Sequence, residues 1–456
     1  MEQTVSNSWE KRDKETVFHG FTDLGTLNAD GPVVLTHGDG IRVFDVHGRS
    51  YIDANSGLWN NVAGFNHHGI IDALCDQARK FPGYHAFFGR VADTTVELSE
   101  KLIELSPFNA GKVYYTNSGS EANDTVVKML WMLHRRNGQP QRRKIITRLN
   151  AYHGVTVATA SMTGKAYNAE FGLPLPGFLH ADCPHFWRFG LQGETEEQFS
   201  ARLARNLEEL IVKEGPDTIA GMFAEPVQGA GGVIPPSKGY FEAIRPILRR
   251  YNIPLIADEV ICGFGRTGEM WGSVKYNMEP DVIVASKCIT AGYFPMGAVI
   301  LGKDFSEALT KASEEAEEFP HGFTAGGNPL GSAVALKSLQ VIEDEGLLEN
   351  VNKVSPRFLE RLNKLGEHKY AGEARGVGLM GAVEMVADKI TKEPLPSDLQ
   401  ISERIANKAL EKGLICRPLG QAIVLGPPFI ITEKDVDDIF DILEETVNEV
   451  FADVGL

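Results

Sequence analysis

The stretch from residue 252 to residue 297 constrains the fold more than any other part of this 456-residue chain. It contains two short apolar runs that are rich in β-branched residues, 253–257 and 282–285. Runs of this kind, bounded by proline and polar residues, are typical of fully buried strands in a parallel sheet. The sequence therefore predicts an α/β protein whose central sheet includes these two strands.

Charged residues follow both runs. Asp258 and Glu259 come directly after the first run, and Lys287 comes shortly after the second. Because ligands of open α/β sheets bind beyond the carboxyl ends of the strands, we expect a carboxylate and an amine to face one crevice. A solvated ion pair accounts for the same pattern equally well from these residues alone.

Two chemical details favour a reactive site over a solvated ion pair. Lys287 lies between the small residues Ser286 and Cys288, and a partly desolvated lysine loses preference for its charged form, which suits Schiff-base chemistry. A buried Asp258 requires a hydrogen-bonded or cationic partner, and a protonated pyridine nitrogen is such a partner.

Several motifs occur in a characteristic order between about residues 20 and 430: TNSGSEAND, AYHG, FAEPVQGAGG, ADEV, ASK and HGFTAGG. Together they resemble the class III pyridoxal-phosphate-dependent aminotransferases of fold type I, and within that class the ω-amino acid or amine:pyruvate transaminases. The resemblance implies a large, mostly parallel-sheet domain and a small α+β domain. We expect an N-terminal segment, 1–60, that joins the small domain, a large cofactor-binding domain, 61–325, and a C-terminal small domain, 326–456.

The same resemblance implies pyridoxal 5′-phosphate as the cofactor. Lys287 would form a Schiff base with it and move a proton during catalysis, and Asp258 would keep the ring nitrogen protonated. Tyr152 would stack on the ring, although His153 beside it is by itself more typical of a structural histidine. The expected cofactor-binding residues are Ser118, Gly119, Ser120, Tyr152, His153, Glu225, Asp258, Val260, Lys287, Phe323 and Thr324.

The phosphate site is expected at the start of a helix. Ser118 and Glu121 have the spacing of a capping box, and helix capping alone is sufficient to account for both residues. The resemblance instead implies that the free N–H groups and the positive end of this helix hold the phosphate. It also implies that Thr324 completes the phosphate site of a second subunit, so we expect a homodimer, or a tetramer, with shared active sites.

The expected substrate-binding residues are Phe21, Leu58, Trp59, Phe87, Phe88, Tyr152 and Arg417. A purely structural role is also compatible with some of these residues. Trp59 could belong to the core, and the aromatic loop 81–90 could serve a subunit interface alone. Arg417 by itself is more typical of a surface residue or an ion pair, whereas the resemblance implies a mobile arginine that binds the substrate's carboxylate.

We therefore interpret the chain as an ω-transaminase that moves an amino group from an amine or ω-amino acid to a keto acid, expected to be pyruvate, by a ping-pong mechanism. An aminomutase, an epimerase or a decarboxylating transaminase would use the same residues. A non-catalytic pyridoxal-phosphate-binding protein is disfavoured, because the reactive residues are intact. The segment GAGG, 229–232, lacks the GxGxxG spacing of a nicotinamide site.

The composition of the chain argues against several classes of binding partner. The formal net charge of −16 argues against nucleic acid and anionic membranes, which bind basic surfaces. Five scattered cysteines without a CxxC pair predict no metal site and suit a reducing compartment. The polar N-terminus and the lack of an 18-residue apolar run predict a cytoplasmic protein without a membrane segment.

Four local predictions concern regular structure. Residues 30–56 have the alternation and turns of an antiparallel meander. Residues 144–154 are expected to form a strand that ends in Tyr152 and His153. Residues 196–214 have the spacing of an amphipathic helix, and a C-terminal helix is expected to begin after Thr432 as its cap.

Overall fold

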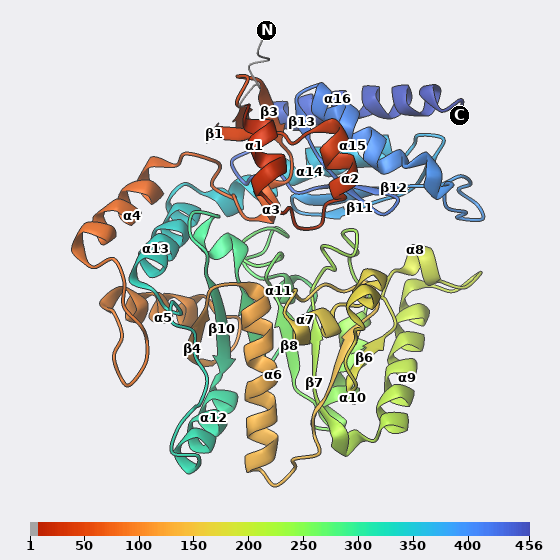
Figure 1. Cartoon of the computed structure of the whole chain (residues 1–456). Helices are drawn as coiled ribbons and strands as arrows, with labels where there is room; N and C mark the ends of the chain where they lie inside the picture. Colours follow the sequence, from red (N-terminus) through yellow and green to blue (C-terminus); the bar gives the residue numbers. More distant parts are fainter. Residues whose placement is uncertain (1–7) are drawn as a thin grey trace.

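The computed structural model describes residues 8–456. Its largest element is a seven-stranded sheet, which occupies the lower half of the molecule in Figure 1. In sheet order the strands are β4 (Ala110–Thr116), β10 (Gly297–Gly302), β9 (Val282–Ala285), β8 (Leu255–Asp258), β7 (Ile219–Ala224), β5 (Lys144–Arg148) and β6 (Phe178–Ala181). The strands from β9 to β6 pair in parallel, and β10 is antiparallel to both of its neighbours. The predicted α/β class with a mostly parallel sheet is confirmed.

The two strands that the sequence placed at the centre are present and fully buried. All four residues of β8 and all four of β9 are buried, and Ala257 pairs with Ile283 in parallel register. Successive residues face opposite sides, since Ile256 packs into one apolar cluster and Ala257 into another. Helices therefore cover both faces of the sheet, which explains the continuous apolar runs.

One predicted strand is too long. β5 ends at Arg148, and Tyr152 and His153 lie in the loop that follows it. The chain turns there because Asn150 adopts a left-handed backbone with φ +63°, while the N–H of Ala151 donates to the carbonyl of Arg148. The turn carries both side chains away from the sheet, toward the carboxyl ends of the neighbouring strands.

Two smaller sheets lie above the large one in Figure 1, where N-terminal and C-terminal elements come together. The first contains β1 (Leu35–Asp39), β2 (Arg42–Asp45), β3 (Ser50–Asp53) and β13 (Leu414–Ile415), and the second contains β11 (Ala371–Val377), β12 (Met380–Met385), β15 (Ala422–Leu425) and β14 (Arg417–Leu419). The predicted antiparallel meander is confirmed, and β13 joins it in parallel with Leu414 opposite Ile52. The domain limits at residues 60 and 325 stay a prediction.

Helices surround the three sheets. They are α1 (Trp9–Thr16), α2 (Leu24–Asp30), α3 (Ser56–Trp59), α4 (His68–Lys80), α5 (Asp93–Leu105), α6 (Gly119–Arg136), α7 (Val157–Met162), α8 (Phe186–Phe189), α9 (Glu196–Glu214), α10 (Tyr240–Arg250), α11 (Gly272–Lys275), α12 (Lys303–Glu315), α13 (Pro329–Asp344), α14 (Leu347–Leu365), α15 (Ile401–Glu411) and α16 (Glu433–Asp453). Short 3-10 turns are η1 (Ala166–Phe171), η2 (Pro216–Thr218), η3 (Lys287–Thr290) and η4 (Ser397–Leu399). Within residues 8–456, no helix combines the length and the apolar character that crossing a membrane requires.

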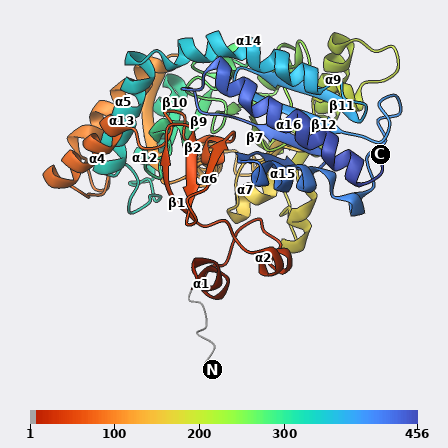
Figure 2. The ribbon, with the colours of Figure 1, turned by 90° about the horizontal axis from the view of Figure 1, so that it is seen from above.

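Two of the predicted helices are confirmed at their ends. α9 spans 196–214 as expected, and α16 begins after Thr432, whose hydroxyl accepts the N–H of Asp435 in a reciprocal capping box. Figure 2 shows α14 and α16 side by side, where Arg361 pairs with Asp437 across the two helices. α14 packs on β11 and β12 of the second small sheet, and α16 packs on α14 and α15.

Candidate active site

The two charged strand ends meet at a small cavity, which we call the inner cavity. It encloses about 200 Å³ between the carboxyl ends of β8 and β9 and the N-terminus of α6. Predicted site residues that line it are Ser118, Gly119, Ser120, Tyr152, His153, Glu225, Asp258, Val260 and Lys287. Segments that are far apart in the sequence thus come together here, as the parallel-sheet argument predicted.

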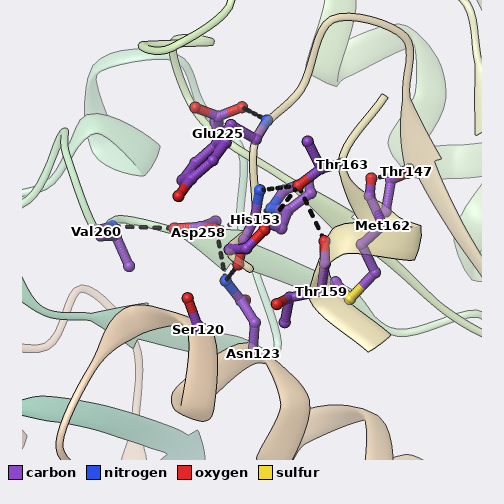
Figure 3. A network of polar contacts seen from close by, with 12 residues as sticks. Ser120, Asn123, Thr147, His153, Thr159, Met162, Thr163, Glu225, Asp258 and Val260 are labelled. Atoms are coloured by element: carbon purple, nitrogen blue, oxygen red, sulfur yellow. Dashed lines mark hydrogen bonds and ion pairs between the residues drawn. The ribbon is translucent and has the colours of Figure 1, made fainter. Parts of the chain in front are cut away.

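Asp258 lies at the base of the inner cavity and is held by three donors. Its Oδ2 accepts the side-chain amide of Asn123 at 2.7 Å and Nδ1 of His153 at 2.8 Å. Its Oδ1 accepts the N–H of Val260 at 3.1 Å (Figure 3). The carboxylate is 3% exposed, and these bonds offset the cost of burying it.

His153 and Asn123 both bond to the same carboxylate oxygen, Oδ2 of Asp258. The backbone N–H of His153 donates to Thr163 Oγ1 at 3.0 Å, while Nε2 of its ring has no partner in the described chain. His153 therefore lines the cavity and also orients Asp258, and its contact with a cofactor stays a prediction. Asn123 was not predicted from the sequence, although it lies one helical turn after Gly119 on the same face of α6.

Lys287 projects from η3, immediately beyond β9. Its backbone is left-handed, with φ +49°, a strained conformation for a residue with a side chain. The side-chain amine makes no hydrogen bond or ion pair with residues 8–456. Burial lowers the pKa of Lys287, although the charge of Asp258 opposes this effect. Its neutral, nucleophilic form is therefore populated at lower pH than that of a lysine in water.

The N-terminus of α6 forms the opposite wall. Ser118 caps the helix, with Oγ accepting the N–H of Glu121 at 3.2 Å. The predicted capping box is only half formed, because the carboxylate of Glu121 accepts the N–H of Asn117 instead of that of Ser118. A Cβ at Gly119 would lie 2.8 Å from the side chain of Val260, so only glycine allows this close approach.

Glu225, at the end of β7, fixes the loop that carries Tyr152. Its carboxylate accepts the N–H of Tyr152 at 3.0 Å and the N–H of Gly229 at 2.9 Å. Burial raises the pKa of Glu225. The acid thus acts on the cavity through the backbone, by fixing the segment that carries the side chain of Tyr152 into the cavity wall.

A larger space, the outer cavity, adjoins the inner one. It encloses about 870 Å³ and shares Tyr152, Ile261 and Lys287 with the inner cavity. The predicted substrate residues that line it are Phe21, Leu58, Trp59, Tyr152 and Arg417. The amine of Lys287 therefore stands at the junction, where a molecule in the outer cavity can reach it.

Trp59 and Phe21 both line the outer cavity, but one side chain is buried and the other is exposed. Trp59 is 1% exposed and packs in an apolar cluster, so the core interpretation of this residue also holds. Phe21 is 72% exposed, and its ring lies edge-on to that of Tyr167 with centroids 5.7 Å apart. One aromatic wall is therefore fixed by the core, and the other is formed by the N-terminal segment.

Arg417 begins β14 and points into the outer cavity. Its side chain forms no hydrogen bond or ion pair in the described part of the chain, so the alternative of an ion pair does not apply. Its role in binding a substrate's carboxylate stays a prediction. Burial lowers the pKa of Arg417, and its charge acts on Tyr152 and Tyr167. A guanidinium that lacks a carboxylate partner in a cavity can bind an anionic ligand.

Four predicted residues line neither cavity of this chain: Phe87, Phe88, Phe323 and Thr324. Phe88 is 82% exposed, and Thr324 is exposed as well. Phe87 lies directly against Gly322, so the two loops that carry these residues touch. Their contribution to a second subunit's site stays a prediction.

The outer cavity also contains residues that the sequence did not single out: Lys165, Tyr167, His185, Arg188, Arg375 and Glu384. His185, Glu373 and Glu384 offer three potential metal ligands within 4.8 Å of one another. However, Arg375 donates to both carboxylates, at 2.6 and 2.7 Å, and Arg188 pairs with Glu384. The cationic partners of these acids make the group a salt-bridge network in place of a metal site.

Comparison with known proteins identifies the family. The family model "Aminotransferase class-III" matches residues 26–447. The chain belongs to the class III aminotransferases. A PMP-bound aminotransferase from Vibrio fluvialis is 63% identical, with a TM-score of 0.96 over 98% of each chain. An omega-aminotransferase from Paracoccus denitrificans is 61% identical, with a TM-score of 0.97 over 98% of this chain and 100% of its own.

A curated relative agrees with the structural ones. The mitochondrial gamma aminobutyrate transaminase 1 of Solanum lycopersicum is 41% identical over 420 residues, which make up 92% of this chain and 82% of that protein. Class III aminotransferases are fold type I enzymes that use pyridoxal 5′-phosphate, so this chain is a pyridoxal-phosphate-dependent aminotransferase. The alternatives of a non-catalytic binding protein and a nicotinamide dehydrogenase are thereby set aside.

The residues of the inner cavity fit this cofactor. A phosphate suits the N-terminus of the 18-residue helix α6, where Gly119 keeps the approach open and Ser120 adds a hydroxyl. An aldehyde suits the unpartnered amine of Lys287, and a protonated pyridine nitrogen suits the carboxylate of Asp258. Tyr152 offers an aromatic face for a flat ring. The phosphate, the aldehyde, the ring nitrogen and the ring face therefore each have a counterpart in the cavity.

Proposed function

We propose that this class III aminotransferase is an ω-transaminase, which moves an amino group from an amine or ω-amino acid to pyruvate by a ping-pong mechanism. The observation that carries the proposal is the junction of the two cavities at Lys287. One buried amine reaches both the cofactor-shaped inner cavity and a large outer cavity that contains an unpaired Arg417. The similarity to the Paracoccus omega-aminotransferase supports the same assignment.

Lys287 is the residue that moves the proton. The bound cofactor supplies an electron sink for the bond that breaks at the substrate's amine-bearing carbon. With the cofactor bound, the side-chain amine of Lys287 would remove a proton from that carbon as a general base and would deliver it, as a general acid, to the cofactor and not back to the same carbon. Burial lowers the pKa of Lys287, which favours the base step because the neutral amine forms more readily than in a solvated lysine.

The other residues of the inner cavity supply a negative charge and orient the ring of the cofactor. Asp258, fixed by Asn123 and His153, places a negative charge at the base of the cavity that favours a protonated ring nitrogen. Tyr152, fixed through Glu225, sets the plane of the ring. These groups are positioned before the substrate enters, so their orientation costs nothing during the reaction.

The ping-pong cycle requires one cavity to accept two different molecules. An amine donor presents an apolar or polar tail, whereas a keto acid presents a carboxylate. Arg417 has no partner in the described chain that would hold it in one position. It can therefore point toward a carboxylate or away from an apolar tail.

We further propose a homodimer with shared active sites. Thr324 is exposed and lines neither cavity of its own chain, which suits a role in the phosphate site of a second subunit. The exposed aromatic side chains of Phe18 and Phe88 suit burial at such an interface. We also propose a reducing, cytoplasmic location, which the five scattered cysteines support.

A panel of amines tests the function, with pyruvate as the acceptor and alanine as the measured product. The cofactor-loaded enzyme is expected to form alanine in proportion to the amine consumed. It is also expected to convert the cofactor stoichiometrically in each half-reaction when donor and acceptor are added separately. An aminomutase or epimerase would rearrange one substrate without an acceptor, and a decarboxylating enzyme would release carbon dioxide. Either result would contradict the proposal.

A further inference from the structure

The basic residues of the outer cavity differ in whether they have acidic partners. Arg188 and Arg375 line the cavity and pair with Glu384. Lys287 faces the inner cavity, where the charge of Asp258 acts on it. The remaining two cations, Lys165 and Arg417, form no ion pair within residues 8–456. The cavity therefore carries two positive charges that the described protein does not neutralise by contact.

Lys165 lies in the segment between α7 and η1, beside the loop that carries Tyr152. Its backbone is fixed, since its N–H donates to Thr163 and its carbonyl accepts the N–H of Asn168. Its side-chain amine makes no hydrogen bond in the described chain. Its position in the cavity wall is thus set by the backbone, and its amine is available to a ligand.

Glu225, the acidic residue whose charge acts most on Lys165, already accepts other hydrogen bonds. Glu225 acts on it through space, but the two carboxylate oxygens of Glu225 accept the N–H groups of Tyr152 and Gly229. Arg417 acts on Lys165 in the opposite sense, as a like charge. Two unpaired cations in a partly desolvated cavity are costly, and an anionic ligand between them relieves that cost.

The geometry points to Lys165 as a specificity-determining residue for the distal end of the substrate. This inference rests on the proposed transaminase function. With Arg417, Lys165 forms a cationic end of the outer cavity that binds a carboxylate on the donor's tail. The enzyme therefore favours ω-amino carboxylates over diamines of the same length.

The distal ammonium group of a diamine donor would find no free acidic partner in the outer cavity. Glu384 is the one acidic side chain among the described residues that line the outer cavity. Its Oε2 accepts Nη1 of Arg375 at 2.7 Å, and its Oε1 accepts the guanidinium of Arg188. A distal ammonium would have to compete with two arginines for this carboxylate while facing Lys165 and Arg417, so the charges of the cavity oppose it.

Three donors that differ only at the distal end test the inference: 4-aminobutanoate, butylamine and 1,4-diaminobutane. The amine half-reaction of the cofactor-loaded enzyme is followed by stopped flow without any acceptor, so that keto-acid binding does not contribute. The measured quantity is the ratio of the apparent second-order rate constant for each charged donor to that for butylamine. Lys165→Met removes the charge, Lys165→Arg keeps it, and Lys213→Met is the control at an exposed lysine in the last turn of α9.

We expect Lys165→Met to lower the ratio for 4-aminobutanoate about tenfold to hundredfold, as for the loss of a charge-assisted hydrogen bond. The ratio for 1,4-diaminobutane should rise in the same variant. Lys165→Arg should restore the wild-type order of donors, and Lys213→Met should leave it unchanged. An unchanged ratio in Lys165→Met, with a working half-reaction, would overturn the inference and leave the proposed function intact.

A failure of the proposed function would give a different result. In that case the wild-type enzyme itself would convert none of the three donors. If Lys165→Met folds poorly, an equilibrium binding measurement on a second variant, Lys165→Gln, tests the inference instead. Pentanoate has a carboxylate but neither an amine nor a keto group, and its dissociation constant is measured by calorimetry with cofactor-loaded enzyme. Weaker binding in Lys165→Gln, but not in Lys213→Met, is expected. Equal binding in wild type and Lys165→Gln would contradict the role of Lys165.

Discussion

The inner and outer cavities share Lys287 but differ in how their charged groups are held. In the inner cavity, Asp258 has three donors and Glu225 has two. In the outer cavity, Lys165 and Arg417 have no partner in the described chain. The two carboxylates are thus fixed where every substrate undergoes the same reaction. Beside the paired Arg188, Arg375 and Glu384, the outer cavity keeps two cations free where substrates differ in shape and charge.

The elements that build each cavity explain this difference. The inner cavity is formed by strand ends and the N-terminus of a long helix, whose backbone hydrogen bonds hold side chains in narrow ranges of position. The outer cavity is formed by the N-terminal segment at Phe21, the irregular α3 at Leu58 and the edge strand β14 at Arg417. Such segments adjust more easily than a sheet core.

The largest expected effect comes from Lys287→Ala, which removes the group at the junction. Turnover should fall by about ten-thousandfold or more, because general acid–base and nucleophilic catalysis are lost together. The measurement is alanine formation from pyruvate and a reactive amine, with Lys275→Ala as a control at an exposed lysine of α11. Normal multiple turnover by Lys287→Ala would contradict the assignment of the junction.

Asp258→Asn tests whether the fixed charge of the inner cavity matters beyond its shape. The amide occupies the same volume but cannot stabilise a protonated ring nitrogen. Loss of several kcal/mol of transition-state stabilisation should slow proton abstraction by about a thousandfold. The rate of the amine half-reaction checks this. Glu259→Gln is a matched control, because the neighbouring Glu259 instead accepts the N–H groups of Gly272 and Ser273.

A rate close to wild type in Asp258→Asn would mean that the inner cavity acts by shape alone. A similar loss in Glu259→Gln would mean that the strand end as a whole, and not the charge of Asp258, determines the rate. Burial raises the pKa of Glu259 to about 7, so the half-reactions of both variants are compared at one pH above that value.

Arg417→Ala tests the freedom of the outer cavity. The half-reaction with pyruvate should weaken about tenfold to hundredfold more than the half-reaction with butylamine, because only the keto acid loses a charge-assisted bond. Stopped-flow rates of the two half-reactions provide the measurement, and Arg205→Ala on the exposed side of α9 is the control. Equal losses in both half-reactions would show that Arg417 is structural.

The smallest expected effect is a pH dependence of donor preference. Burial lowers the pKa of Lys165 from 10.5, Glu225 and Cys183 oppose the shift, and Arg417 adds to it. The charge of Lys165 is present below its lowered pKa and is lost as pH rises through that value. The ratio for 4-aminobutanoate over butylamine should therefore decline with rising pH before pH 10.5 is reached, and it should not decline in Lys165→Arg.

This comparison uses a ratio of donors, so titrations that affect both donors equally cancel. A ratio that stays constant up to pH 10.5 in the wild-type enzyme would mean that Lys165 keeps the charge of a solvated lysine. The same decline in Lys165→Arg would assign the titration to another group. Either result would contradict the prediction that the lowered pKa of the buried Lys165 controls donor preference.

The amino-acid sequence alone was enough to locate the central strands and the groups at their ends. Buried strands need apolar residues on both faces, so β8 and β9 are visible as runs. Asp258 is the last residue of β8, and Lys287 comes shortly after β9. The helix start at Ser118 and the cap at Thr432 are also local signals. A property carried by neighbouring residues can be read without knowing the tertiary packing.

Which distant groups meet became known only from the folded chain. Asn123 bonds to Asp258 across 135 positions, and Arg375 bonds to Gly232 across 143, so neither contact has a local signature. The turn at Asn150 moved Tyr152 out of the predicted strand and into the wall of both cavities. Lys165 resembles any other lysine in the sequence, because its lack of an ion-pair partner in the described chain is a property of the folded cavity.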